Sequence, residues 1–186
     1  MSLANEIAGE DHGLWDAFRK GSEEAFAEIT RLHYRSLFSY GIKFSRDREF
    51  IKDCIQDLFL ELWAKRESLG DTGFIKFYLL KSLRRKIHRE GSRRNRIQEE
   101  AEPDWESDMA VDESIEQKLI GLETDEARWQ QLNRQLELLS KRQQEVIYLK
   151  FFETLSNEAI AEVMSISRQA VANLIYRTIR ELRERI

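Results

Sequence analysis

The residues best suited to specific chemistry lie near the C-terminus, on a helix predicted over residues 168–185. The apolar positions of this helix leave a polar face that begins with Arg168, Gln169 and Asn173. Arginine can pair with guanine in the major groove of DNA, and asparagine or glutamine can pair with adenine. The full candidate set on this face is Arg168, Gln169, Asn173, Tyr176, Arg177 and Arg180. We therefore expect the first residues to read base edges and the later arginines to contact phosphates.

The residues in front of this helix have the spacing of a helix-turn-helix core. Ala161 is a small residue where two helices would meet, and Ser165, four positions later, would form the turn. Apolar residues follow at Ile166, Val171 and Leu174, which are one, six and nine positions after the turn residue. Many such motifs have glycine at the turn, so serine makes a left-handed turn slightly more costly. The spacing predicts a DNA-reading motif, and a plain helical hairpin is the alternative.

A second candidate surface is a basic run in the middle of the chain. Residues 81–96 carry eight basic side chains and one acidic side chain. We predict a helix from Phe74 to about Glu90, with Phe74 and Phe77 among its apolar core positions. Its basic face consists of Lys81, Arg84, Arg85, His88 and Arg89. Such a face suits a polyanion, and an ordinary solvated helix face is the alternative.

A third pattern is a long amphipathic helix, with an unbroken apolar stripe from Ile51 to Trp63 at steps of three or four. Its opposite face carries Asp53, Gln56, Asp57, Leu60 and Glu61. Leu60 is an apolar residue on a charged face, which suits the centre of a protein interface with a polar rim. An isolated surface leucine is the alternative interpretation.

The sequence does not indicate an enzyme, a metal site or another cofactor. The histidines, His12, His33 and His88, are scattered, and no phosphate-binding loop or nucleophile setting accompanies them. Cys54 is the single cysteine, which excludes an intrachain disulfide and a thiolate zinc cluster and suits a reducing compartment. No apolar run is long enough to cross a bilayer. We therefore expect a cytoplasmic protein without membrane insertion.

The elements that would position these surfaces are helices. The 186-residue chain has 41% hydrophobic residues, one proline and eight glycines, a composition that favours long helices over a turn-rich β-sandwich. Residues 97–127 carry 12 acidic side chains and one lysine, and periodicity is lost from residue 93. We predict an all-α protein with two small helical domains, residues 10–92 and 128–186, joined by a flexible acidic linker over residues 93–127. Ser22, Ser140 and Ser156 are the predicted helix caps.

Four stretches of the sequence resemble bacterial sigma-70 factors of the extracytoplasmic-function group. Residues 53–63, DCIQDLFLELW, resemble a helix of their second region, and residues 74–85, FIKFYLLKSLRR, resemble the helix that follows it. Residues 138–146, LLSKRQQEV, and the stretch from Leu155 to Arg183 resemble their fourth region. The stretches occur in the order found in that group, which also lacks a third domain.

The resemblance implies a factor that binds core RNA polymerase and directs it to promoter DNA. By this analogy, the polar face over residues 53–61 would dock on the clamp helices of the β′ subunit, and the C-terminal domain would contact the β flap. The loop over residues 67–73 and the helix after it would read and open the −10 element, while the helix over residues 168–185 would read the −35 element. The resemblance assigns the −10 element to Lys76, Tyr78, Lys81, Arg84, Arg85 and Arg89. An anti-sigma factor is a further expected partner.

Two other classes of protein would also use a helix-turn-helix or a sigma-like fold. A stand-alone DNA-binding regulator would need a dimerisation surface and a palindromic site, and the interface-like helix over residues 51–63 argues against it. A decoy adaptor that binds an anti-sigma factor without touching DNA would have no use for the basic run over residues 81–96. The sequence therefore favours the sigma factor.

Overall fold

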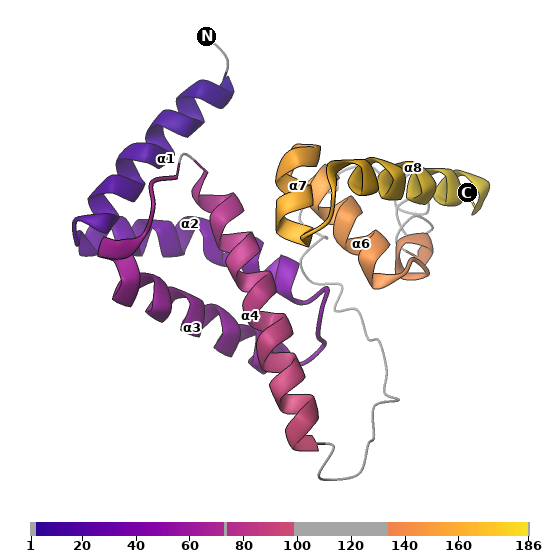
Figure 1. Ribbon diagram of the computed structural model, residues 1–186, viewed down its shortest axis with the longest axis horizontal. Coiled ribbons are helices and arrows are strands. Elements are labelled where there is room, and N and C mark those ends of the chain that lie inside the picture. Colours follow the sequence, from indigo (N-terminus) through magenta and orange to yellow (C-terminus); the bar gives the residue numbers. More distant parts are fainter. Residues whose placement is uncertain (1–2, 73, 99–133, 186) are drawn as a thin grey trace, which may run out of the picture. The chain divides into compact units, whose positions relative to one another are not determined.

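The computed structural model describes residues 3–72, 74–98 and 134–185, and all of the regular elements within these ranges are helical, as predicted (Figure 1). The chain divides into two units, Met1–Glu102 and Pro103–Ile186, each with a core of its own. Most of the predicted acidic linker lies outside the described residues. None of the helices in the described ranges has the length and apolar character needed to cross a membrane.

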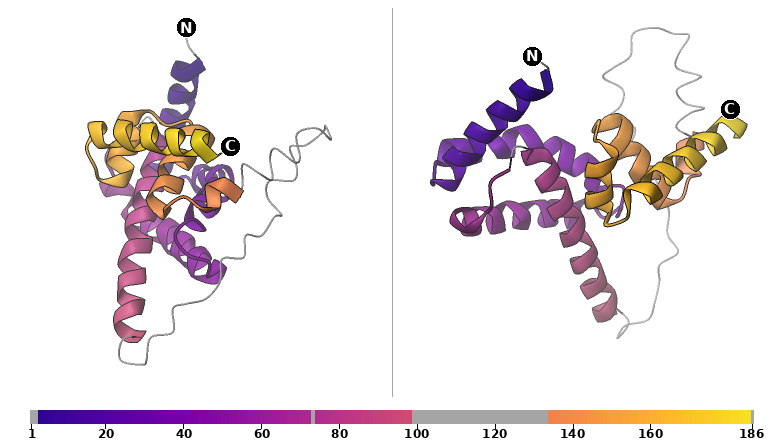
Figure 2. Two further views of the ribbon diagram at one scale, coloured as in Figure 1. Left: turned by 90° about the vertical axis from the view of Figure 1, so that its right-hand side faces the viewer. Right: turned by 45° about the horizontal axis from the view of Figure 1, so that its top comes forward.

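The described part of the N-terminal unit, residues 3–72 and 74–98, contains four helices and one 3-10 turn. In chain order these are α1 (Leu3–Arg19), α2 (Glu23–Gly41), α3 (Arg48–Lys65), η1 (Arg66–Ser68) and α4 (Ile75–Gln98). The central helix is α2, which contacts α1, α3 and α4, and α3 also packs along α4 (Figures 1 and 2). The arrangement therefore brings the polar face of α3 and the basic face of α4 into one small bundle.

Side-chain caps fix where two of these helices begin. Ser22 Oγ accepts a hydrogen bond from Ala25 N at 3.1 Å, and Asp47 Oδ1 accepts one from Phe50 N at 2.9 Å. Each cap satisfies an amide that has no partner inside its helix. The predicted helix start at Ser22 is confirmed.

The first helix, α1, was not predicted, although it completes the core. Trp15 and Phe18 are fully buried, and their spacing of three residues is the periodic signal that could have indicated a helix. Trp15 Nε1 donates a hydrogen bond to Gly70 O at 3.0 Å, and Asp11 Oδ2 accepts one from Ile75 N at 3.2 Å. Because both bonds reach across more than fifty residues, α1 holds the loop in front of α4 in place.

The fourth helix is longer than predicted. It continues to Gln98 rather than ending near Glu90, so the whole basic run lies on one continuous helix and the predicted domain end at residue 92 falls inside it. Contacts with α3 support the extension: Arg94 Nη1 lies 2.8 Å from Asp47 Oδ2, and the Arg94 guanidinium stacks 4.8 Å from the Phe50 ring centroid. Gly91 does not interrupt the helix, and its backbone is helical like that of its neighbours.

The C-terminal unit contains α6 (Lys141–Ile147), one turn of π-helix labelled η3 (Tyr148–Phe152), α7 (Asn157–Met164) and α8 (Arg168–Arg185). The predicted capping box is present: Gln143 N donates to Ser140 Oγ at 3.4 Å, and Ser140 N donates to Gln143 Oε1 at 3.0 Å. Val146, Ile160 and Val171 are fully buried and form part of the core. The bounds of α8 agree with the helix predicted over residues 168–185, and Ser156 caps α7 as predicted.

The turn between α7 and α8 has the predicted left-handed geometry. Ser165 has φ 56° and ψ 47°, and Ile166 N donates to Ala161 O at 2.9 Å across the turn. Ala161 and Val171 are buried at the meeting point of the two helices, whereas Ile166 and Leu174 are half-buried. The helix-turn-helix geometry is therefore confirmed.

Ser165→Gly is expected to stabilise the C-terminal unit by about 0.5–1 kcal/mol, because glycine adopts a positive φ without strain. The greater entropy of glycine in the unfolded chain offsets part of this gain. Native-state hydrogen exchange of the α7 and α8 amides measures this unit separately. Ser167→Gly is the control, since Ser167 Oγ caps Ala170 N at 3.1 Å and its loss should cost a few tenths of a kcal/mol. A destabilising Ser165→Gly would contradict the strain assigned to the turn.

Candidate nucleic-acid and protein interfaces

The polar face predicted for α3 is exposed, while the opposite stripe forms the core. Ile51 and Ile55 are fully buried, and Leu60 is 60% exposed. The side chains that share the exposed face are Asp53, Gln56, Asp57, Leu60 and Glu61. An apolar side chain surrounded by polar ones is the composition found at the centre and rim of protein interfaces.

Two acids of this face are held by a lysine that the sequence analysis did not single out. Lys86, on α4, is 4% exposed, and its Nζ lies 2.7 Å from Glu61 Oε1 and 3.7 Å from Asp57 Oδ2. The hydrogen bond from Lys86 lowers the pKa of the Glu61 carboxyl below its ordinary value. A signal for burial existed in the sequence, because Lys86 lies three residues after Leu83 and next to Ile87, on the apolar stripe of α4.

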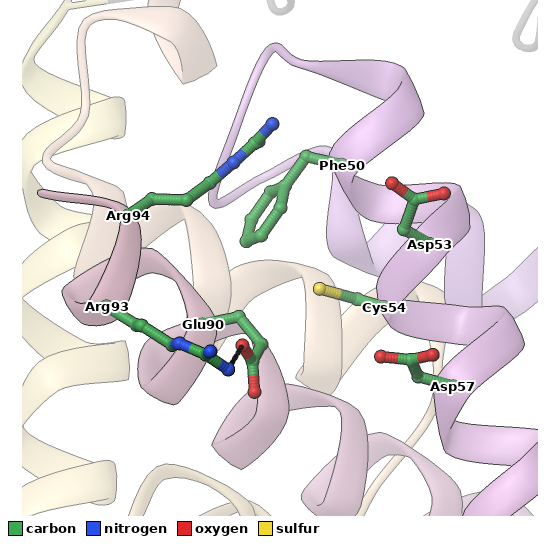
Figure 3. A pocket seen from close by; sticks show the side chains of 7 residues that line it. All are labelled: Phe50, Asp53, Cys54, Asp57, Glu90, Arg93 and Arg94. Atoms are coloured by element: carbon green, nitrogen blue, oxygen red, sulfur yellow. Dashed lines mark ion pairs between the residues drawn. The ribbon is translucent and has the colours of Figure 1, made fainter. Parts of the chain in front are cut away.

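A cavity of about 280 Å³ lies beside this face, between α3 and the C-terminal half of α4 (Figure 3). It is lined by Phe50, Asp53, Cys54, Asp57, Glu90, Arg93 and Arg94. Burial raises the pKa of the Cys54 thiol to about 11. Since the thiolate is the reactive and metal-binding form, this cysteine is a poor nucleophile at neutral pH.

The candidate −10 residues on α4 differ in their surroundings. Arg85 and Arg89 are exposed, whereas Lys76, Tyr78, Lys81 and Arg84 are half-buried. The Tyr78 ring packs 5.3 Å from the Trp15 ring centroid, so Tyr78 contributes to the core as well as to the surface. Arg89 pairs with Glu90 at 3.0 Å and with Glu61 at 3.4 Å. The half-buried Phe77 ring lies 5.6 Å from Lys81 Nζ.

The prediction that Phe74 belongs to the core is wrong. Phe74 is 62% exposed and lies immediately before α4, which begins at Ile75. Ile75 and Leu79 are fully buried and take the core positions assigned to Phe74 and Phe77. The apolar stripe at this end of α4 is therefore shifted by one or two residues, and a large aromatic ring is left at the surface beside the loop.

The polar face of α8 is exposed, as the sequence predicts. Its members Arg168, Gln169, Asn173, Tyr176, Arg177 and Arg180 are all exposed. Arg168 Nε lies 2.8 Å from Glu158 Oε1, and Gln169 Nε2 donates to Asn173 Oδ1 at 3.2 Å. Exposed pairs of this kind contribute little stability, so they can be exchanged for contacts with DNA at low cost.

An exposed aromatic pair in the C-terminal unit was missed by the sequence analysis. Phe151 and Phe152 lie in the π-helical turn and are about half exposed. Phe152 stacks on Tyr148 with the ring centroids 5.5 Å apart. Two adjacent phenylalanines next to Lys150 were the available signal for an apolar surface.

Two family models match the sequence in the places where these surfaces lie. The model of Sigma-70 region 2 matches residues 29–97, and the model of Sigma-70, region 4 matches residues 129–182. Together they cover more than half of the chain. The chain belongs to the sigma-70 family. It is a sigma factor, a protein that binds core RNA polymerase and promoter DNA and directs the initiation of transcription.

Solved sigma factors share the fold. The sigma factor RpoE from Bartonella quintana, determined in complex with the anti-sigma factor NepR, is 21% identical with a TM-score of 0.67, covering 86% of this chain and 94% of RpoE. CnrH, determined in complex with the cytosolic domain of CnrY, is 19% identical with a TM-score of 0.60, covering 94% of this chain and 95% of CnrH. None of the curated protein sequences matches this sigma factor.

Proposed function

We propose that this protein is an alternative sigma factor of the extracytoplasmic-function group, which docks on polymerase through α3 and reads promoters through α4 and α8. The observation that carries the proposal is the polar face of α3, where the exposed Leu60 lies among Asp53, Gln56, Asp57 and Glu61. Such a face has no use in a stand-alone regulator, which needs only its helix-turn-helix and a dimerisation surface. Co-purification of core polymerase with the full chain tests the proposal, and a failure to form the complex would contradict it.

The clamp helices of the β′ subunit are the proposed partner of the α3 face. Leu60 supplies an apolar centre that is desolvated on docking, and the carboxylates around it supply a rim that selects a basic partner surface. The C-terminal unit contacts the β flap, and the exposed Phe151 and Phe152 are its candidate apolar contacts. The N-terminal and C-terminal units then hold the polymerase at two places.

The −10 element is assigned to the start of α4 and the loop before it. The hydrogen bonds that Trp15 donates to Gly70 and Ile75 donates to Asp11 hold this loop, and Phe74 presents an exposed ring next to it. An aromatic ring beside cations is the arrangement that binds unstacked bases and the phosphates that join them. The cations of the set are Lys76, Lys81, Arg84, Arg85 and Arg89. Phe74 replaces Tyr78 as the main stacking candidate, because Tyr78 packs on Trp15.

Phe74→Ala is expected to weaken the open promoter complex by about 1–3 kcal/mol, the usual contribution of one base–aromatic stack. Permanganate reactivity of unpaired thymines in the −10 region measures the fraction of open complex. Phe74→Trp should retain melting, whereas Phe74→Leu, which keeps the apolar bulk without the ring, should lose nearly as much as alanine. A leucine variant that melts promoters like the parent would remove the stacking role.

An anti-sigma factor is the proposed regulator. RpoE, which shares the fold, was determined in complex with the anti-sigma factor NepR. In this chain, Leu60, Phe151 and Phe152 are large apolar side chains left in contact with solvent, and an anti-sigma factor that covers them would block polymerase binding. The cytoplasm, where polymerase and DNA are found, is the proposed location.

A further inference from the structure

The most unusual ionic contact in the N-terminal unit joins a buried cation to two exposed anions. Lys86 is 4% exposed, whereas the side chains of Glu61 and Asp57 are 46% and 58% exposed. Its ammonium hydrogen-bonds Glu61 at 2.7 Å and lies 3.7 Å from Asp57. The two carboxylates are four residues apart on α3, where like charges repel each other on neighbouring turns of a helix. Lys86 therefore supplies the positive charge that lets both acids stay side by side on one face.

Stability alone gives a poor reason for lysine at this position. Burying an ammonium costs free energy that its ion pairs repay only in part, and well-packed apolar residues at such places are often neutral or stabilising. The neighbours of Lys86 on the same stripe, Leu83 and Ile87, are buried apolar residues, so an apolar side chain would suit the packing. A lysine at this position is explained if the function of the α3 face depends on where the two carboxylates are held.

We infer that Lys86 is a positioning residue for polymerase docking, which acts from beneath the α3 face by holding Glu61 and Asp57 in place for a basic partner surface. This inference rests on the proposed docking face. Lys86 does not itself reach the partner, because it is only 4% exposed. Fixing two carboxylates in advance reduces the entropy that docking would otherwise have to remove from them. The second cation on Glu61, Arg89, is exposed and lies at 3.4 Å, so it gives a weaker constraint.

Lys86→Met keeps the length and apolar stem of the side chain and removes the charge. We expect this variant of the full chain to melt at or above the temperature of the parent and to bind core polymerase about tenfold more weakly, a typical coupling for residues in direct contact. Lys86→Arg should recover most of the affinity, because it restores a cation at the same place. Lys20→Met is the matched control, since Lys20 makes a 2.6 Å ion pair with Asp16 on α1, away from the docking face.

Repeating Lys86→Met in a chain that already carries Glu61→Gln and Asp57→Asn distinguishes a positioning role of Lys86 from a merely structural one. If Lys86 acts through these acids, Lys86→Met should lower the polymerase affinity of this double variant by less than about threefold. An equal tenfold loss in both backgrounds, or binding within twofold of the parent in the single variant, would overturn the inference. If Lys86→Met does not fold, Lys86→Gln, whose amide still donates a hydrogen bond, replaces it with the same thresholds.

The docking face is tested independently by Leu60→Asp, a change that leaves Lys86 and its two acids in place. Loss of binding in Leu60→Asp together with normal binding in Lys86→Met overturns only the positioning role. Normal binding in Leu60→Asp contradicts the docking face itself, and the inference falls with it.

Discussion

Leu60→Asp is expected to lower the affinity for core RNA polymerase at least about thirtyfold, corresponding to about 2 kcal/mol or more. The leucine is 60% exposed, so its apolar surface is free to be buried by a partner. The aspartate removes that contribution and places an additional charge in a desolvated interface. Competition with a labelled sigma factor for purified core polymerase measures the change.

The fold of this variant should be unaffected, because position 60 lies opposite the buried stripe of α3. Leu60→Met, which keeps the apolar bulk, should bind like the parent and is the matched control. Gln56→Ala combined with Asp57→Ala should give a smaller loss, since rim residues contribute less than the centre. Unchanged affinity in Leu60→Asp, with an intact helical spectrum, would show that α3 docks elsewhere or not at all.

Arg168→Ala and Asn173→Ala are each expected to cost about 1–3 kcal/mol at particular bases of the −35 element. Both side chains are exposed in the first half of α8, the part of a recognition helix that meets base edges. In the free protein Arg168 pairs with Glu158 and Asn173 accepts from Gln169, and both contacts can be exchanged for bases. Binding of the holoenzyme to a library of −35 variants measures the base preferences.

Arg180→Ala provides the contrasting case, because Arg180 lies farther along α8 and pairs only weakly with Glu184 at 3.5 Å. If Arg180 contacts a phosphate, its removal should weaken binding to all promoter sequences equally. The slope of log affinity against log salt concentration should fall by about one counterion. Identical base preferences in the Arg168, Asn173 and Arg180 variants would refute the reading face assigned to α8.

The parts of the fold that depend on local signals could be predicted from the sequence. The bounds of α7 and α8 follow from serine caps and apolar spacing within a few residues, and the left-handed turn follows from the position of Ser165. The two faces of α3 follow from a single periodic stripe. For the same reason, every residue that was predicted for the interface faces of α3 and α8 is exposed, and the roles of these residues are proposals.

The parts that were missed depend on contacts between distant residues. α1 owes its place to Trp15, whose indole reaches Gly70, and α4 is extended by Arg94, which reaches Asp47. Phe74 is exposed because Ile75 takes its place in the core, a shift that periodicity at a helix end does not resolve. The position of Lys86 on the apolar stripe of α4 was a signal for its burial, but its pairing with Glu61 on α3 depends on how the two helices pack.

In the sequence, the strongly acidic residues 97–127 directly follow the basic run of residues 81–96. Residues 99–133 lie outside the described part of the chain. The charges on α3, α4 and α8 are nevertheless sufficient to derive polymerase docking and promoter reading from described residues.

Reconstituted transcription with purified core polymerase and a pool of genomic promoter fragments tests the central claim most directly. A sigma factor with these surfaces should make core polymerase initiate at a discrete set of promoters that share −10 and −35 elements, and Leu60→Asp should abolish that activity while leaving the fold intact. Specific binding of the free chain to palindromic sites, without any promoter-specific transcript from core polymerase, would contradict the assignment and indicate a stand-alone regulator.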